Sequence, residues 1–183
     1  MIRLFTALEI PQKIRQRLSL MGGGIPGARW VVTDAMHITL RFIGEVDRPM
    51  ARDIDSALSD LQGPPISLRL AGIDQFGDKK KPRSLWMGVV AGAELFDLQK
   101  RMETKLTRIG LKPDGRNFTP HVTLARLKNS PIDRVAAFMA NNNLITTENF
   151  TVDHFTLFSS HPAPEGSLYI EEESYPLTLP ARV

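Results

Sequence analysis

The feature that most constrains the fold of this chain is a four-residue phrase that occurs twice. It reads His-Ile-Thr-Leu at residues 37–40 and His-Val-Thr-Leu at residues 121–124. Both copies lie in segments that favour strands, where side chains two residues apart point to the same face of a sheet. Each copy therefore places one imidazole beside one hydroxyl. The chain has only four histidines, so this repeat is a stronger signal than a lone short motif.

Two such pairs around one point suit attack on a phosphate ester. With an unperturbed pKa of ~6.5, one imidazole can take a proton from water while the other gives one to the leaving oxygen. The hydroxyls of Thr39 and Thr123 can bind the phosphate oxygens. The alternative is structural, with His37 and His121 merely bonded to these hydroxyls in two half-buried strands.

The composition of the chain excludes several other kinds of fold and active site. The 183 residues suit one domain or two tightly packed lobes. The chain has no cysteine, which excludes disulfides, thiolate nucleophiles and cysteine-based metal sites. The histidine spacings do not match zinc motifs, and no Gly-x-Ser-x-Gly elbow occurs. The net charge of +3 favours phosphate-bearing partners. With neither a signal-peptide layout nor a membrane-length apolar stretch, we expect a cytoplasmic protein without membrane contact.

The apolar spacing predicts four helices between strand-like segments. The expected helices cover residues 11–21, 49–61, 93–109 and a segment from 131 to about 140, and the expected strands cover residues 3–10, 29–32, 37–46, 66–76, 84–91, the second motif, 149–159 and 168–177. Each half contains one motif strand and two helices. We therefore predict an α+β fold with two pseudo-symmetric lobes joined near residues 75–95, mostly antiparallel sheets, outer helices, and motif strands that face one another across a central groove. Residues 1–183 would form this single domain.

The segments around the motifs resemble the 2H phosphoesterase superfamily, and more closely its RNA 2′,3′-cyclic phosphodiesterases, also called 2′-5′ RNA ligases. The similar segments are residues 3–11, 30–31, 37–46, 85–86, 118–126 and 166–169. The resemblance implies a bilobal α+β fold with the active site between the lobes. It also implies hydrolysis of RNA or nucleotide 2′,3′-cyclic phosphates to 2′-phosphomonoesters without metal or cofactor, by a monomer with no obligate protein partner.

The same resemblance implies roles for individual residues. His37 and His121 would be the acid–base pair, and we assign His37 as the proton donor and His121 as the proton acceptor. Thr39, Thr123 and Arg126 would bind phosphate.

Two further positions depend on the exact course of the strands. Phe42 would stack on a nucleobase, which is worth ~1–3 kcal/mol in single-strand binding. Strict alternation, however, puts Phe42 and Arg126 on the face opposite the histidines, so a bulge or twist must bring them round if they act there. Alternation puts Arg41 on the histidine face, either lining the groove or solvated.

Residues outside the motifs have less distinctive interpretations. Lys79–Lys81 with Arg83 could guide RNA or form a solvated hairpin tip. Trp30 and Trp86 are expected in the core, and His154 is expected as a hydrogen-bonded polar residue. Tyr169 could reach the groove or lie at the edge of the core.

Other functions remain open at this level. The chain could be a 2′-5′ RNA ligase acting on tRNA halves, or a nucleotide- or RNA-binding module without catalysis. Its natural substrate could be an RNA end, a cyclic mononucleotide, a cyclic ADP-ribose derivative or a 2′-5′ oligonucleotide.

Overall fold

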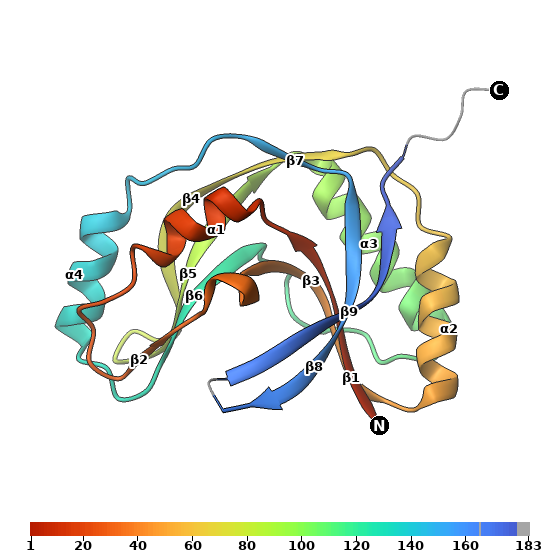
Figure 1. Ribbon diagram of the computed structural model, residues 1–183, viewed down its shortest axis with the longest axis horizontal. Coiled ribbons are helices and arrows are strands. Elements are labelled where there is room, and N and C mark those ends of the chain that lie inside the picture. Colours follow the sequence, from red (N-terminus) through yellow and green to blue (C-terminus); the bar gives the residue numbers. More distant parts are fainter. Residues whose placement is uncertain (165, 179–183) are drawn as a thin grey trace.

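The computed structural model describes residues 1–164 and 166–178, which form one curled sheet with helices packed around it (Figure 1). In chain order the elements are β1 (Ile2–Glu9), α1 (Gln12–Ser19), β2 (Ala28–Trp30), the 3₁₀ helix η1 (Thr33–Ala35), β3 (His37–Val46), α2 (Arg48–Ser59), β4 (Ile66–Asp78), β5 (Lys81–Ala91), α3 (Ala93–Arg108), β6 (His121–Leu127), α4 (Ile132–Asn142), β7 (Phe150–Val152), β8 (His154–Ala163) and β9 (Gly166–Pro176).

The nine strands belong to one antiparallel sheet in the order β7-β4-β5-β6-β3-β1-β8-β9, and β2 pairs with β6 beside this path. The predicted α+β class with antiparallel strands and outer helices is confirmed. One detail differs from the expectation, because the motif strands β3 and β6 do not face one another from separate sheets. They are neighbours that pair at Ile38 and Val122. The division into two lobes stays a prediction.

The core lies between the sheet and the helices. The β-branched and leucine residues of the two motifs, at positions 38, 40, 122 and 124, are at most 2% exposed. Helix α3 packs against β3 and α4 packs against β4 and β5, with the apolar side of α3 buried at residues 95, 98, 102 and 106. Burying these side chains supplies most of the driving force for folding, at roughly 25 cal/mol per Å² of apolar surface.

Local signals set several helix boundaries. Asp47 caps α2 by accepting a hydrogen bond from the backbone N–H of Met50 at 2.9 Å, and a proline stands in the first turn. Among the described residues, no helix is both long and apolar enough to cross a bilayer.

One predicted strand is divided in the structure. The segment predicted as a single strand over residues 149–159 breaks at Asp153 into β7 and β8. β7 pairs with β4 at one end of the strand order, whereas β8 lies between β1 and β9 near the other. The chain thus passes between distant parts of the curled sheet within one residue, as the ribbon above the other strands shows (Figure 1).

Candidate active site

The two motifs meet on one face of the sheet, hereafter the motif face. Because Ile38 pairs with Val122 in an antiparallel ladder, His37 lies across from Thr123 and His121 lies across from Thr39. The residues between them point into the core, so both imidazoles and both hydroxyls lie on the opposite, accessible side. The structure therefore brings together the four motif side chains that the sequence singled out.

Both imidazoles are held in the same way. The Nδ1 atom of His37 lies 2.8 Å from the carbonyl oxygen of Ala35, and the Nδ1 atom of His121 lies 2.6 Å from the carbonyl oxygen of Thr119. A carbonyl only accepts, so each Nδ1 carries the proton and donates it. This leaves the Nε2 atom of each neutral ring as an acceptor for proton transfer. At His37, Nε2 lies 3.1 Å from the Thr39 hydroxyl, which donates to it.

Aromatic rings surround both histidines. The ring of His37 lies 4.9 Å from Phe5 and 5.2 Å, edge-on, from Tyr169. The ring of His121 lies 4.8 Å from Phe76 and 5.5 Å from that of the tryptophan at position 86. These contacts remove water from the imidazoles, which disfavours their charged form.

The pKa values of both imidazoles are lowered by this environment. Burial is the main cause at His37, and nearby His121 and Arg126 add to it, so that the pKa falls to about 4 although the bond to Ala35 partly opposes the change. At His121 burial again lowers the pKa, with a further contribution from Arg126. Both rings of the free protein are therefore neutral near pH 7.

A β-bulge follows each motif at the same position. β1 pairs Ala7 with Thr39 but Thr6 with Arg41, which leaves Leu40 as an extra residue in β3. β5 likewise skips the leucine at position 124 of β6 between two paired positions. In both motif strands two consecutive buried residues follow the threonine, and the next side chain is exposed. A bulge of this kind shifts the alternation by one residue.

These bulges bring Phe42 and Arg126 to the motif face. Both are the fifth residue after their motif histidine and the second after the bulge. The lowering of both histidine pKa values by Arg126 places its charge near the two imidazoles. Phe42 is 37% exposed, and the guanidinium of Arg3 lies 5.0 Å from the centroid of its ring. Cation–π contact of this kind leaves the other side of the ring available.

The same bulge overturns both readings of Arg41. Its side chain is turned away from the motif face and only 8% exposed, so it neither lines a groove nor is solvated. The Arg41 Nε atom lies 2.5 Å from a carboxylate oxygen of Glu103 on α3, and the guanidinium also donates to the carbonyl of Lys112 at 2.6 Å. Arg41 therefore ties β3 to the segment that leads into the second motif.

Some of the other residues singled out in the sequence have their predicted role, and others lie beside the motif histidines. Trp30 packs on Phe138 of α4, as expected of a core residue, whereas Trp86 lies beside His121. His154 is hydrogen-bonded to Asp153 and Glu9, as predicted. The aromatic neighbours Phe5 and Phe76 were missed because nothing local in the sequence distinguishes them from core residues.

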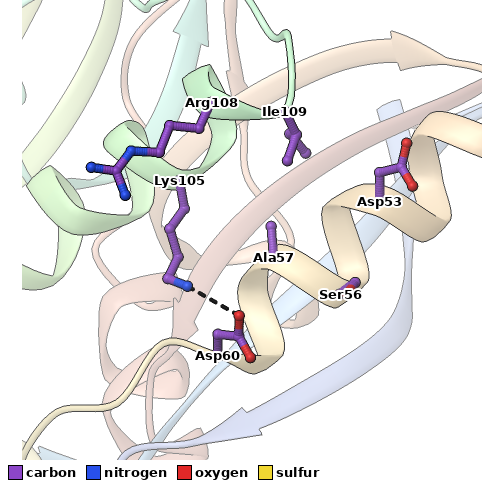
Figure 2. A pocket seen from close by; sticks show the side chains of 7 residues that line it. All are labelled: Asp53, Ser56, Ala57, Asp60, Lys105, Arg108 and Ile109. Carbon is purple, nitrogen blue, oxygen red and sulfur yellow. Dashed lines mark hydrogen bonds and ion pairs between the residues drawn. The ribbon is translucent and has the colours of Figure 1, made fainter.

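Two cavities of the described residues bear on the location of the site. A small cavity of about 60 Å³ lies beside His37 and includes Phe5, Arg15 and Tyr169 in its wall. A cavity of about 490 Å³ lies between α2 and α3, where Lys105 reaches toward Asp60 at 3.3 Å (Figure 2). This second cavity contains none of the predicted site residues. Within the described ranges, no group of three or more His, Asp or Glu side chains could hold a metal ion.

Comparisons with known proteins agree with this geometry. The family model for LigT-like phosphoesterases matches residues 8–86 and 89–169, two stretches that each contain one motif. An RNA 2′,3′-cyclic phosphodiesterase from Thermotoga maritima is 31% identical over 175 residues, which is 92% of this chain and 91% of that protein. One from Aeropyrum pernix is 40% identical over 115 residues, which is 62% of this chain and 65% of that protein.

The fold has solved relatives as well. The crystal structure of E. coli LigT complexed with 3′-AMP superposes with a TM-score of 0.79 at 23% identity and covers 97% of this chain and 99% of that one. The paired motifs, their common face and the family match over both halves lead to one conclusion: the chain belongs to the LigT-like phosphoesterase family.

Proposed function

We propose that this protein is a phosphodiesterase that hydrolyses RNA ends bearing a 2′,3′-cyclic phosphate to 2′-phosphomonoesters, without a metal ion. The observation that carries the proposal is the equivalent anchoring of His37 and His121 through Nδ1, which leaves both Nε2 atoms as proton acceptors on one face. Binding alone does not require two proton-transfer groups in this arrangement. The activity named for the relatives from Thermotoga maritima and Aeropyrum pernix supports the same substrate class.

The proposed reaction is a single in-line displacement. The Nε2 atom of His121 takes a proton from water while the water oxygen forms a bond to phosphorus. The bond from phosphorus to O3′ breaks, and protonated His37 gives its Nε2 proton to O3′. The products are a free 3′-hydroxyl and a 2′-phosphomonoester. His121 then holds the proton taken from water and His37 has given its proton to O3′, so proton exchange with solvent restores both rings.

The neighbouring side chains would stabilise the charge on the phosphate. The hydroxyls of Thr39 and Thr123 would donate hydrogen bonds to its non-bridging oxygens, and Arg126 would supply positive charge from beyond the bulge. Phe42 would stack on the nucleobase with the side of its ring that Arg3 does not cover.

The burial of His37 makes its protonation depend on substrate. An imidazole with a pKa of about 4 is a poor proton reservoir at neutral pH. A bound phosphodiester brings a negative charge next to the ring, which favours the imidazolium and raises the pKa of His37. The proton donor would therefore be created by substrate binding. In the reverse assignment, His37 is the acceptor and His121 the donor.

The E. coli relative was crystallised with 3′-AMP, which fits a site for a nucleotide at the end of an RNA. Because the relatives from Thermotoga maritima and Aeropyrum pernix are named for activity on RNA, we place RNA ends ahead of cyclic ADP-ribose derivatives and 2′-5′ oligonucleotides. A 2′-5′ RNA ligase acting on tRNA halves is the reverse type of reaction at the same site. A cytoplasmic location stays a prediction.

Product analysis tests this proposal. The protein is incubated in EDTA with an oligonucleotide that ends in a 2′,3′-cyclic phosphate. The products are then separated by chromatography and identified by comparison with synthetic 2′- and 3′-phosphate standards. We expect the 2′-phosphate alone. A 3′-phosphate would refute the assigned leaving group, and loss of turnover in EDTA would refute the metal-free reaction. A 2′-5′ joined product would favour the ligase, and binding without turnover would favour the non-catalytic module.

A further inference from the structure

An arginine on the short strand β2 lies beside the proposed site and has no role so far. Arg29 is the direct cross-strand partner of Arg126. Directly opposed residues of an antiparallel pair share a face, and the flanking Trp30 packs on α4 at the other side of the sheet. Because Arg126 is on the motif face, Arg29 lies there as well, along the same edge of β6 that β3 borders at Val122.

Among the described residues, no carboxylate balances the positive charges of Arg29 and Arg126. Both are exposed, and neither makes an ion pair or side-chain hydrogen bond within residues 1–164 and 166–178. Like charges directly opposite one another are destabilising in a sheet unless an anion lies between or above them. The buried Arg41, which has its own carboxylate, shows the contrasting case. The arginine pair on the motif face is thus arranged to receive an anionic ligand.

The positions of Arg126 and Arg29 indicate different roles for their guanidinium groups. Arg126 acts on both imidazoles, so its charge lies close enough to serve the reacting phosphate. Arg29 is level with Arg126 on the neighbouring strand but is not among the charges that lower the pKa of either imidazole, so its guanidinium lies further from the histidines. A single phosphorus atom between the histidines does not extend to it. A second phosphate group of the same nucleic acid, on the 5′ side of the terminal nucleotide, would reach Arg29.

Further positive charge lies on the other side of β6 from Arg29. From Ser84, the partner of Arg126 on β5, the hairpin continues to the exposed Lys81, Lys80 and Lys79. At the opposite end of the sheet, β9 carries the exposed run of glutamates at residues 171–173. A polyanion is attracted toward the first end and repelled from the second.

We propose that Arg29 binds the phosphodiester that precedes the cyclic end, with the Lys79–Lys81 hairpin tip contacting phosphates further upstream. This inference rests on the proposed function and narrows it. The protein would act more efficiently on cyclic-ended oligonucleotides than on cyclic mononucleotides. Arg29 would determine that preference without taking part in proton transfer.

The test compares two substrates that share the same reacting end. One is a 2′,3′-cyclic mononucleotide with a free 5′-hydroxyl, and the other is a tetranucleotide that ends in the same cyclic nucleotide. In Arg29→Gln we expect kcat/KM to fall about ten-fold on the tetranucleotide, as for loss of a charged hydrogen bond, and to change less than about two-fold on the mononucleotide. The slope of log kcat/KM against log salt concentration should become shallower by ~0.7, as expected for the loss of one phosphate contact to a single strand.

The matched control is Arg52→Gln, which removes an exposed arginine from α2 and should leave both values unchanged. An equal loss on both substrates would overturn the proposal, because Arg29 would then act on the reacting phosphate or on the fold. An unchanged value on the tetranucleotide would also overturn it.

A binding measurement separates this inference from the proposed function. Fluorescence anisotropy with a labelled tetranucleotide that ends in a 2′-phosphate needs no turnover. If the wild type hydrolyses neither substrate, the proposed function fails. A ten-fold weaker Kd in Arg29→Gln would still support the subsite, and an unchanged Kd would refute it. Replacing Lys79, Lys80 and Lys81 together by Gln should weaken binding of the tetranucleotide more than binding of a dinucleotide with the same end.

Discussion

His37 and His121 make the same contact on neighbouring strands, since each Nδ1–H donates to the carbonyl oxygen two residues earlier in the chain, at 2.8 and 2.6 Å. The equivalence fixes one tautomer for both rings and presents both Nε2 atoms on the motif face. An asparagine side chain can place an amide N–H near the position of Nδ1, but it cannot transfer a proton. Asparagine variants therefore separate the structural part of each histidine from its chemistry.

Acid should destabilise the protein through His37. An unfolded chain takes up a proton on this imidazole near pH 6.5, whereas in the folded protein its pKa is about 4. The unfolded state thus binds more protons between these values, and stability falls as the pH is lowered from 6.5 to 4. The contribution is as much as about 3 kcal/mol. Urea unfolding at pH 7.5 and pH 4.5 should show a smaller difference for His37→Asn than for the wild type; equal differences would contradict the buried, neutral ring.

The pH dependence of catalysis should differ between free and substrate-bound enzyme. Because burial lowers the pKa of both imidazoles in the free protein, the optimum of kcat/KM should lie below pH 6.5. The bound phosphodiester raises both pKa values, so the optimum of kcat should lie at higher pH. Initial rates over a pH series at low and saturating substrate give both curves. Coincident optima above pH 7.5 would show that the substrate does not control these protons.

The motif threonines should matter for the phosphate rather than for the fold. Thr39→Val and Thr123→Val keep the shape of the side chain and remove the hydroxyl. If each hydroxyl donates to the charged phosphate, kcat/KM should fall roughly 10–100-fold for each variant. Thermal unfolding should change little, because both side chains lie on the accessible face. Wild-type rates in both variants would remove the threonines from the site.

The Arg41–Glu103 pair should be important for stability. Arg41→Met leaves a partly buried carboxylate without its partner, which typically costs about 3 kcal/mol or more. The double variant Arg41→Met/Glu103→Met should recover much of that loss, since no unpaired charge remains. Denaturant unfolding of the two variants measures this coupling. Equal stability of the single variant and the wild type would contradict it.

The sequence predicted the centre of the site but not its margins. A period of two and a repeated phrase were enough to place His37, Thr39, His121 and Thr123 on a common face. The bulges at residues 40 and 124 could not be predicted, because they are defined by the register with β1 and β5, strands distant in sequence. For this reason strict alternation placed Arg41 on the wrong face.

Long-range topology was also absent from local patterns. Residues 149–159 have a continuous strand-like pattern, yet the chain changes its partner strands at Asp153. Likewise the pairing of Arg29 with Arg126 joins residues 97 positions apart in the numbering. Only the assembled sheet brings such charges together.

The most direct test of the central claim is the rate at which His37→Asn and His121→Asn hydrolyse a 2′,3′-cyclic phosphate end. Circular dichroism first establishes that both variants fold at pH 7.5. If the two imidazoles transfer protons in the same step, kcat should fall at least about 100-fold in each variant. A folded variant that keeps more than about a tenth of the wild-type kcat would contradict paired-histidine catalysis.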